Sequence, residues 1–160
     1  MTKYYVAYGS NLNLKQMSHR CPSATKMITG KLEGYELLFK GQVDHAYATV
    51  EKNPEYSVDV LLWEIDSQSE KSLDHYEGYP HLYTKEVVNV KTSDNREIEG
   101  MMYVMNPKFE VGLPSHTYFM TVLEGYMDNG IDVEPLMQAL SKSSVLLQEN
   151  QKPPVPQMEM

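Results

Sequence analysis

A short polar loop near the start of the chain contains the first residues that could do chemistry. It reads Tyr8-Gly9-Ser10-Asn11-Leu12, after an apolar and aromatic stretch and before a helical pattern. Glycine lets the backbone bend, and the amides that follow can then point into one concavity at a helix N-terminus. Such a loop binds an anion without a cationic side chain. A Gly-Ser-Asn turn between a strand and a helix can equally be a structural connection.

The second candidate is the carboxyl group of Glu77, within residues 73–80. A helix is expected to end at Gly78 and Pro80, and the partial negative charge at a helix C-terminus disfavours an ionised carboxylate. Burial would raise the pKa in the same direction. A carboxyl whose pKa lies near neutrality suits general acid–base catalysis. The alternative interpretation is a solvated turn residue.

Other reactive side chains have less support from their surroundings. Tyr118, near the start of the longest helical pattern, could donate a hydrogen bond to a ligand or simply cover the core. Cys21 is the only cysteine, which rules out an intrachain disulfide and argues against a Cys-based zinc site. The five histidines show no metal-ligand spacing, and Ser10 has no evident triad partner. Nucleotide or phosphate binding by the loop lacks the lysine of a P-loop pattern.

The strands that would position these residues follow from β-branched and aromatic runs bounded by turn residues. A turn at Asn53-Pro54 is expected to separate the third strand from the fourth. The strands are expected over residues 4–8, 31–39, 46–50, 58–65, 83–90 and 97–105.

Four helices are expected from capping and periodicity. Asn13 caps a short helix that ends at residue 20, and Ser67 with Glu70 forms a capping box for a helix over residues 67–76. The third helix begins at Pro114-Ser115 and ends at Asn129-Gly130. The last covers residues 132–148, with its inward face formed by Leu136, Met137 and Leu140.

This order of elements predicts an α+β protein with a small curled mixed sheet or barrel and flanking helices. Residues 1–150 are expected to form a single domain, and residues 151–160 a Pro-rich mobile tail.

Composition narrows the function classes. The 160 residues carry a formal net charge of −8, with scattered lysines and arginines, which argues against nucleic acid as a partner. No apolar run reaches the roughly 20 residues needed to span a bilayer, so no membrane partner is expected. The start of the chain does not read as a signal peptide, and a lone cysteine fits a reducing compartment, so we expect a cytoplasmic protein. A small molecule is the favoured ligand.

Taken together, the motifs resemble the γ-glutamyl cyclotransferase-like family, which includes γ-glutamyl cyclotransferase and γ-glutamylamine cyclotransferase. Their order and rough spacing hold from residue 4 to about residue 140. One departure is Val60, where many members carry glycine, which puts the local strand geometry and pocket width in question. The resemblance rests on Val6-Ala7-Tyr8-Gly9-Ser10-Asn11-Leu12, Arg20-Cys21-Pro22-Ser23-Ala24, Ala48-Thr49-Val50, Leu73-Asp74, Glu77-Gly78, Tyr83, and Pro114-Ser115 with Tyr118.

The resemblance implies an acyltransferase- or lyase-type enzyme that forms 5-oxoproline from a small γ-glutamyl substrate. The α-amine of a γ-glutamyl amide would attack its own side-chain carbonyl and release an amine or amino acid. Glu77 matches the acid–base glutamate, the backbone of Tyr8, Gly9, Ser10, Asn11 and Leu12 matches the substrate cradle, and Tyr83 and Tyr118 match pocket tyrosines. No metal, nucleotide or flavin is required.

Several alternatives stay open. The leaving group could be an amino acid, an amine, the lysine of an isopeptide, or part of a biosynthetic intermediate. Residues 41–45 and 106–113 are expected to form the leaving-group side of the pocket. A binding module of a different class, which keeps the same pocket without catalysis, is the competing function; Glu77 argues against it unless the carboxylate pairs with the ammonium group of the ligand.

Overall fold

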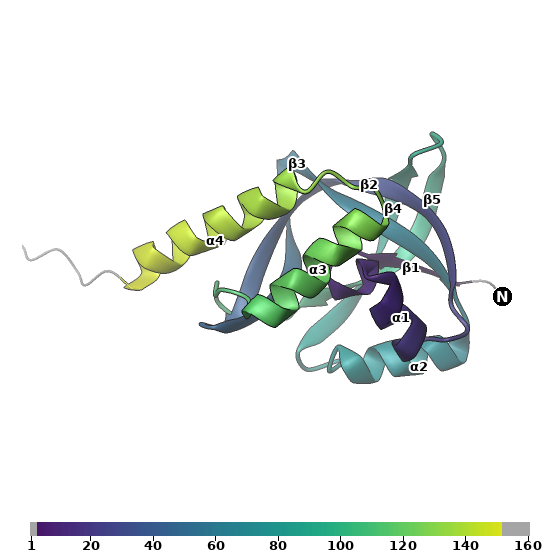
Figure 1. Ribbon diagram of the computed structural model, residues 1–160, viewed down its shortest axis with the longest axis horizontal. Helices are drawn as coiled ribbons and strands as arrows, with labels where there is room; N and C mark the ends of the chain where they lie inside the picture. Colours follow the sequence, from purple (N-terminus) through teal and green to yellow (C-terminus); the bar gives the residue numbers. More distant parts are fainter. Residues whose placement is uncertain (1–2, 152–160) are drawn as a thin grey trace, which may run out of the picture.

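A closed barrel of five strands forms the centre of the computed structural model, which describes residues 3–151 (Figure 1). Neighbouring strands are antiparallel, except that β1 and β5 are parallel where they close the barrel. The α+β class and the mixed barrel are therefore confirmed. The strands, in the barrel order β1-β3-β2-β4-β5, are β1 (Lys3–Ala7), β3 (His45–Ile65), β2 (Thr25–Gln42), β4 (Tyr83–Thr92) and β5 (Glu97–Met105).

The hairpin of β2 and β3 is longer than the sequence suggested. Residues 46–50 and 58–65 belong to one strand, so the predicted turn at Asn53-Pro54 is wrong. The register passes from Glu33 opposite Ser57 to Tyr35 opposite Lys52, which leaves residues 53–56 as a bulge. A bulge bends a strand without ending it, and the Asn-Pro signal marks that bend here. β2 also begins at residue 25 rather than 31.

Helices cover one side of the barrel. Figure 1 shows α3 crossing in front of the sheet beside α1, with α2 below them and α4 at the left of the view. Helix α4 packs on β2, where Lys142 pairs with Glu36. Asn13 caps α1 as expected, and Ser115 is the N-cap of α3. Asp66 rather than Ser67 caps α2, because the Asp66 side chain accepts a hydrogen bond from Ser69 N. The helices are the 3₁₀ turn η1 (Ser10–Leu12), α1 (Leu14–Arg20), α2 (Ser67–Tyr76), α3 (His116–Asp128) and α4 (Glu134–Gln151).

The inward face of α4 differs in part from the expected one. Leu136 is fully buried, but Met137 is 40% exposed. Ser143 is buried instead, and its hydroxyl accepts a hydrogen bond from the backbone N–H of Phe39 at 3.1 Å. The Ser143 hydroxyl therefore provides the partner for a backbone N–H of β2 beneath the helix. The pattern of hydrophobic residues cannot reveal this polar contact.

Within residues 3–151, no helix has both the length and the apolar character of a membrane span. Of the predicted mobile tail at residues 151–160, Gln151 is the last residue of α4, and the others lie outside the described residues.

Helix α3 packs directly on the 3₁₀ turn that follows β1. A Cβ atom on Gly125 would lie 2.6 Å from Asn13 N and 2.7 Å from the carbonyl carbon of Leu12, so only glycine permits this contact. Asn129, the C-cap of α3, donates from Nδ2 to Leu12 O at 2.7 Å. These contacts fix the position of the loop formed by residues 8–12 relative to α3.

Replacing Gly125 with alanine should lower the free energy of unfolding by about 1–3 kcal/mol, because the added methyl group meets backbone atoms that cannot move aside. This loss should occur although alanine favours a helix by about 1 kcal/mol over glycine. Urea denaturation measures the change. The exposed neighbouring variant Glu124→Ala is the control, expected within about 0.5 kcal/mol of the parent. A stabilised Gly125→Ala protein would contradict the packing described.

Candidate active site

A cavity of about 140 Å³ lies where the end of β1, the loop that follows it, the end of α2 and the start of α3 meet. Seven of the chain's twelve tyrosines line it. This volume is several times that required for one water molecule, so the cavity can admit part of a small organic molecule. The lining residues are Tyr5, Tyr8, Gly9, Ser10, Asn11, Tyr47, Ala48, Tyr76, Glu77, Leu82, Tyr83, Tyr103 and Tyr118.

The loop after β1 lines this cavity and has backbone donors without a hydrogen-bond partner in the described part of the chain. Leu12 N donates to Gly9 O at 3.1 Å and Asn13 N donates to Ser10 O at 3.0 Å, which closes the 3₁₀ turn. The amides of Gly9, Ser10 and Asn11 have no hydrogen-bond partner among residues 3–151. Leu12 differs from these three residues: it is fully buried, its amide is already bonded, and it does not line the cavity.

The polar groups of Asn11 hold the loop in place. Trp63 Nε1 donates to Asn11 O at 3.1 Å, and Asn11 Nδ2 donates to the hydroxyl of Tyr5 at 3.0 Å. Arg20 donates to Asn11 Oδ1. The side chain and carbonyl oxygen of Asn11 are therefore bonded within the protein, whereas its backbone N–H has no partner among the described residues.

Gly9 lies in a tight place, where any side chain would closely approach two neighbouring side chains. Its φ is −118°, and a Cβ atom there would lie 3.2 Å from Ala48 Cβ and 3.3 Å from the hydroxyl oxygen of Tyr118. Ser10 Oγ lies 3.1 Å from the hydroxyl of Tyr76, which joins the loop to the end of α2.

Tyr83 and Tyr118 bind opposite backbone groups of one residue. The Tyr83 hydroxyl donates to Ala48 O at 2.7 Å, and the Tyr118 hydroxyl accepts from Ala48 N at 3.1 Å. The hydroxyl proton of Tyr83 is thus bonded to Ala48 O and is not available to a ligand. The hydroxyl of Tyr118 still has a proton that it can donate into the cavity.

Glu77 is placed by the end of α2. The N–H of Gly78 donates to His75 O at 3.2 Å, and that of Tyr79 donates to Asp74 O at 3.0 Å, which together form a Schellman motif. Gly78 adopts φ +62°, as the motif requires. The helix stop predicted at Gly78 is confirmed, and it turns Glu77 into the cavity.

Burial is the main influence on the Glu77 carboxyl, and it raises the pKa to about 7 from the ordinary 4.5, whereas the positive charge of Arg20 lowers it. Glu77 as a whole residue keeps some exposure, but its carboxyl group is enclosed. Hydroxyl groups face it from β1, β4, β5 and α3, and burial holds the pKa of each phenol above its ordinary value. These phenols belong to Tyr5, Tyr8, Tyr83, Tyr103 and Tyr118.

Four other tyrosines of the cavity were not singled out from the sequence, namely Tyr5, Tyr47, Tyr76 and Tyr103. A signal was present, since the chain has twelve tyrosines and three phenylalanines. An excess of tyrosine over phenylalanine indicates that buried hydroxyl groups form hydrogen bonds.

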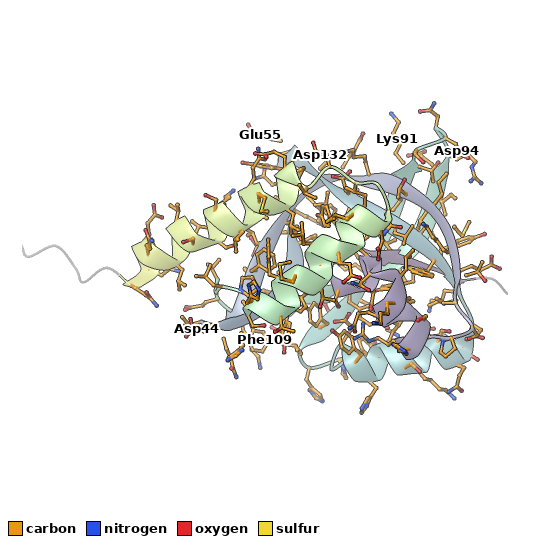
Figure 2. The ribbon with its side chains drawn as sticks, in the orientation of Figure 1. Asp44, Glu55, Lys91, Asp94, Phe109 and Asp132 are labelled. Atoms are coloured by element: carbon orange, nitrogen blue, oxygen red, sulfur yellow. The ribbon has the colours of Figure 1, made fainter. Side chains whose placement is uncertain are left out.

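The segments expected on the leaving-group side lie elsewhere. Residues 41–45 and 106–113 pair with each other, since Gly41 N donates to Glu110 O at 2.8 Å and Leu113 N donates to Val43 O at 2.7 Å. Asp44 and Phe109 mark them in Figure 2, both on the side of the barrel near the base of α3. Neither segment contributes to the cavity, whose outer side is formed by Tyr47, Tyr76 and Leu82.

Val60, the departure from the expected pattern, is fully buried opposite Gly30 of β2 and does not line the cavity. The Val60 side chain therefore forms no part of the cavity wall.

Residues 5–120 match the protein family described as "Gamma-glutamyl cyclotransferase, AIG2-like". The match spans more than half of the chain, so the chain belongs to this family.

Individual relatives agree with that membership. The gamma-glutamylcyclotransferase of Homo sapiens is 30% identical over 138 residues, which cover 81% of this chain and 73% of the human protein. That of Mus musculus is 29% identical over 141 residues, 83% of this chain and 74% of the mouse protein. A solved structure titled "Gamma-glutamyl cyclotransferase" superposes with a TM-score of 0.77 at 26% identity and covers 99% of this chain and 93% of its own. The predicted family and enzyme class are confirmed.

The buried carboxyl should leave a signature in stability. Because the folded-state pKa of Glu77 is raised, its neutral form favours folding, and this contribution is lost as pH rises from about 4.5 to about 7. Relative to the parent, Glu77→Gln should therefore gain up to about 3 kcal/mol in free energy of unfolding between pH 4.5 and pH 8.

Denaturation curves across this pH range measure the difference, with the exposed Glu124→Gln variant on α3 as the control for losing a surface carboxylate. A Glu77→Gln difference that does not change with pH would mean that Glu77 ionises like a solvated glutamate.

Proposed function

We propose that this enzyme releases 5-oxoproline and a free amine or amino acid from a γ-glutamyl amide by intramolecular aminolysis. The observation that carries the proposal is the pairing, in one cavity, of three unused loop amides with an enclosed carboxyl whose pKa lies near 7. The names of the family and of its human and mouse relatives point to the same γ-glutamyl group.

In the proposed complex, the amides of Gly9, Ser10 and Asn11 hold the α-carboxylate, the γ-carbonyl oxygen, or both. Fixing the carboxylate restrains a flexible chain in a ring-closing conformation, which lowers the entropic part of the barrier. A donor directed at the developing oxyanion is worth about 3–4 kcal/mol. Tyr118 supplies a further hydroxyl donor, while Tyr8 and Tyr83 shape the wall, since their protons are bonded to backbone carbonyl oxygens.

Glu77 acts as the general base and then as the general acid of the reaction. The substrate's α-ammonium group is not a nucleophile until it loses a proton, and the Glu77 carboxylate accepts that proton. The α-nitrogen then forms a bond to the γ-carbon, and the bond from the γ-carbon to the leaving nitrogen breaks. The protonated Glu77 gives its proton to the leaving nitrogen and then takes the second proton, which the ring nitrogen must lose to become an amide. It passes this proton to the released amine, which leaves as an ammonium ion, and Glu77 is again a carboxylate. A group with a pKa near 7 is populated in both forms at neutral pH, as this cycle needs.

The direct test is release of 5-oxoproline from a panel of γ-glutamyl dipeptides and γ-glutamyl amines. We expect turnover with the parent protein and a loss on the order of 10²–10⁴ in kcat with Glu77→Gln, the usual contribution of general acid–base catalysis. Glu124→Gln serves again as the matched control and should retain full activity.

Two results would count against the proposal. Binding of γ-glutamyl compounds without any 5-oxoproline would identify a binding module that uses the same pocket. Turnover that survives in folded Glu77→Gln would remove Glu77 from the mechanism while leaving the reaction itself in place.

A further inference from the structure

We infer that Arg20 is a positioning residue for the proposed reaction: its guanidinium group ties the substrate loop to the end of α2 and supplies the positive charge that keeps Glu77 available as a base. This inference rests on the proposed function. The sequence singled out Arg20 only as part of a family motif, and the residue does not line the cavity.

The contacts of Arg20 reach both halves of the site. As the last residue of α1, it donates from Nη1 to Asn11 Oδ1 and from Nη2 to Gln16 Oε1, the latter at 3.2 Å. Its Cζ atom lies 3.3 Å from the centre of the Tyr76 ring. One planar cation thus bonds Asn11 of the cavity-lining loop and stacks on Tyr76, the residue next to Glu77. Lysine cannot make both contacts, because it lacks the flat, forked group.

The charge of Arg20 remains available to act at a distance. Among residues 3–151 it forms no ion pair with a carboxylate. Its neighbours are the amides of Asn11 and Gln16 and a phenol ring, none of which neutralises it. The guanidinium therefore stabilises negative charge nearby, and the enclosed carboxyl of Glu77 is the group in need of it.

Within the part of the chain that the structure describes, no other cation around Glu77 is free to take this part. Lys85 is paired with Glu70 and Asp74. His75 and His81, which flank Glu77 in the chain, are exposed. The groups that face Glu77 from β1, β4, β5 and α3 are phenols, which stay neutral because burial raises the pKa of each. These phenols are Tyr5, Tyr8, Tyr83, Tyr103 and Tyr118.

The test compares Arg20→Gln, which removes the charge, with Arg20→Lys, which keeps the charge but loses the planar fork. Plots of kcat/KM against pH across the neutral range are recorded with the best γ-glutamyl substrate of the panel. For Arg20→Gln we expect the acid-side limb to move to higher pH, with a loss on the order of tenfold in mildly acidic buffer that narrows to less than about threefold in mildly alkaline buffer. For Arg20→Lys we expect the limb of the parent with a loss that does not vary with pH.

Circular dichroism and thermal melts establish that both variants fold. Equal, pH-independent losses in the two variants would reduce Arg20 to a structural role and overturn the inference while the proposed reaction stands.

If the parent protein releases no 5-oxoproline, the proposed function fails instead, and the charge effect of Arg20 is then decided without substrate. A ¹³C NMR titration follows the Glu77 carboxyl in the parent and in Arg20→Gln. The inference requires the midpoint to lie at higher pH in Arg20→Gln than in the parent. An unchanged midpoint would overturn it.

Discussion

Enclosing one carboxyl group in a barrel protein is the constraint on which the site depends. A carboxylate removed from water is costly unless it is neutral or compensated. Here the compensation is partial: phenols surround Glu77, and Arg20 acts on it from outside the cavity. The hydroxyl groups of Tyr8 and Tyr83 are directed at fixed carbonyl partners, so the wall is polar without carrying charge. The carboxyl is left near its midpoint at neutral pH, where a proton can move in either direction.

The rest of the fold holds that carboxyl opposite the loop after β1. The loop is fixed from three directions, by Trp63 of β3, by Arg20 of α1 and by the end of α3 through Asn129. Glu77 is fixed by the Schellman motif of α2. Because these elements are far apart in the sequence, the distance between the loop and the carboxyl depends on closure of the whole barrel. Mutations in the barrel are therefore expected to affect the site by changing the distance between the loop and the carboxyl, and not by removing a reactive group.

Much of this architecture could be predicted from the sequence, because local signals dominate where the chain turns or caps a helix. Asn13, Ser115 and Gly78 acted as local rules say they should. The Asn53-Pro54 signal misled, since a bulge inside a long hairpin uses the same residues as a turn. Part of the cavity lining was predicted, because Glu77 and residues 8–11 carry local signatures. Tyr5, Tyr103 and Arg20 have no such signature, since their contacts are with residues distant in the chain or on another element. Strand pairing and helix packing bring such residues together, and the spacing of residues along the sequence does not predict these long-range contacts.

The site depends above all on a Glu77 carboxyl that is enclosed and titrates near neutrality. The most direct measurement is a ¹³C NMR titration of the side-chain carboxyl carbons in protein labelled at glutamate, with the Glu77 signal assigned from its absence in Glu77→Gln. We expect a midpoint near pH 7 for this one resonance. A midpoint near 4.5, the ordinary value for glutamate, would show that water reaches the carboxyl freely and would contradict the account.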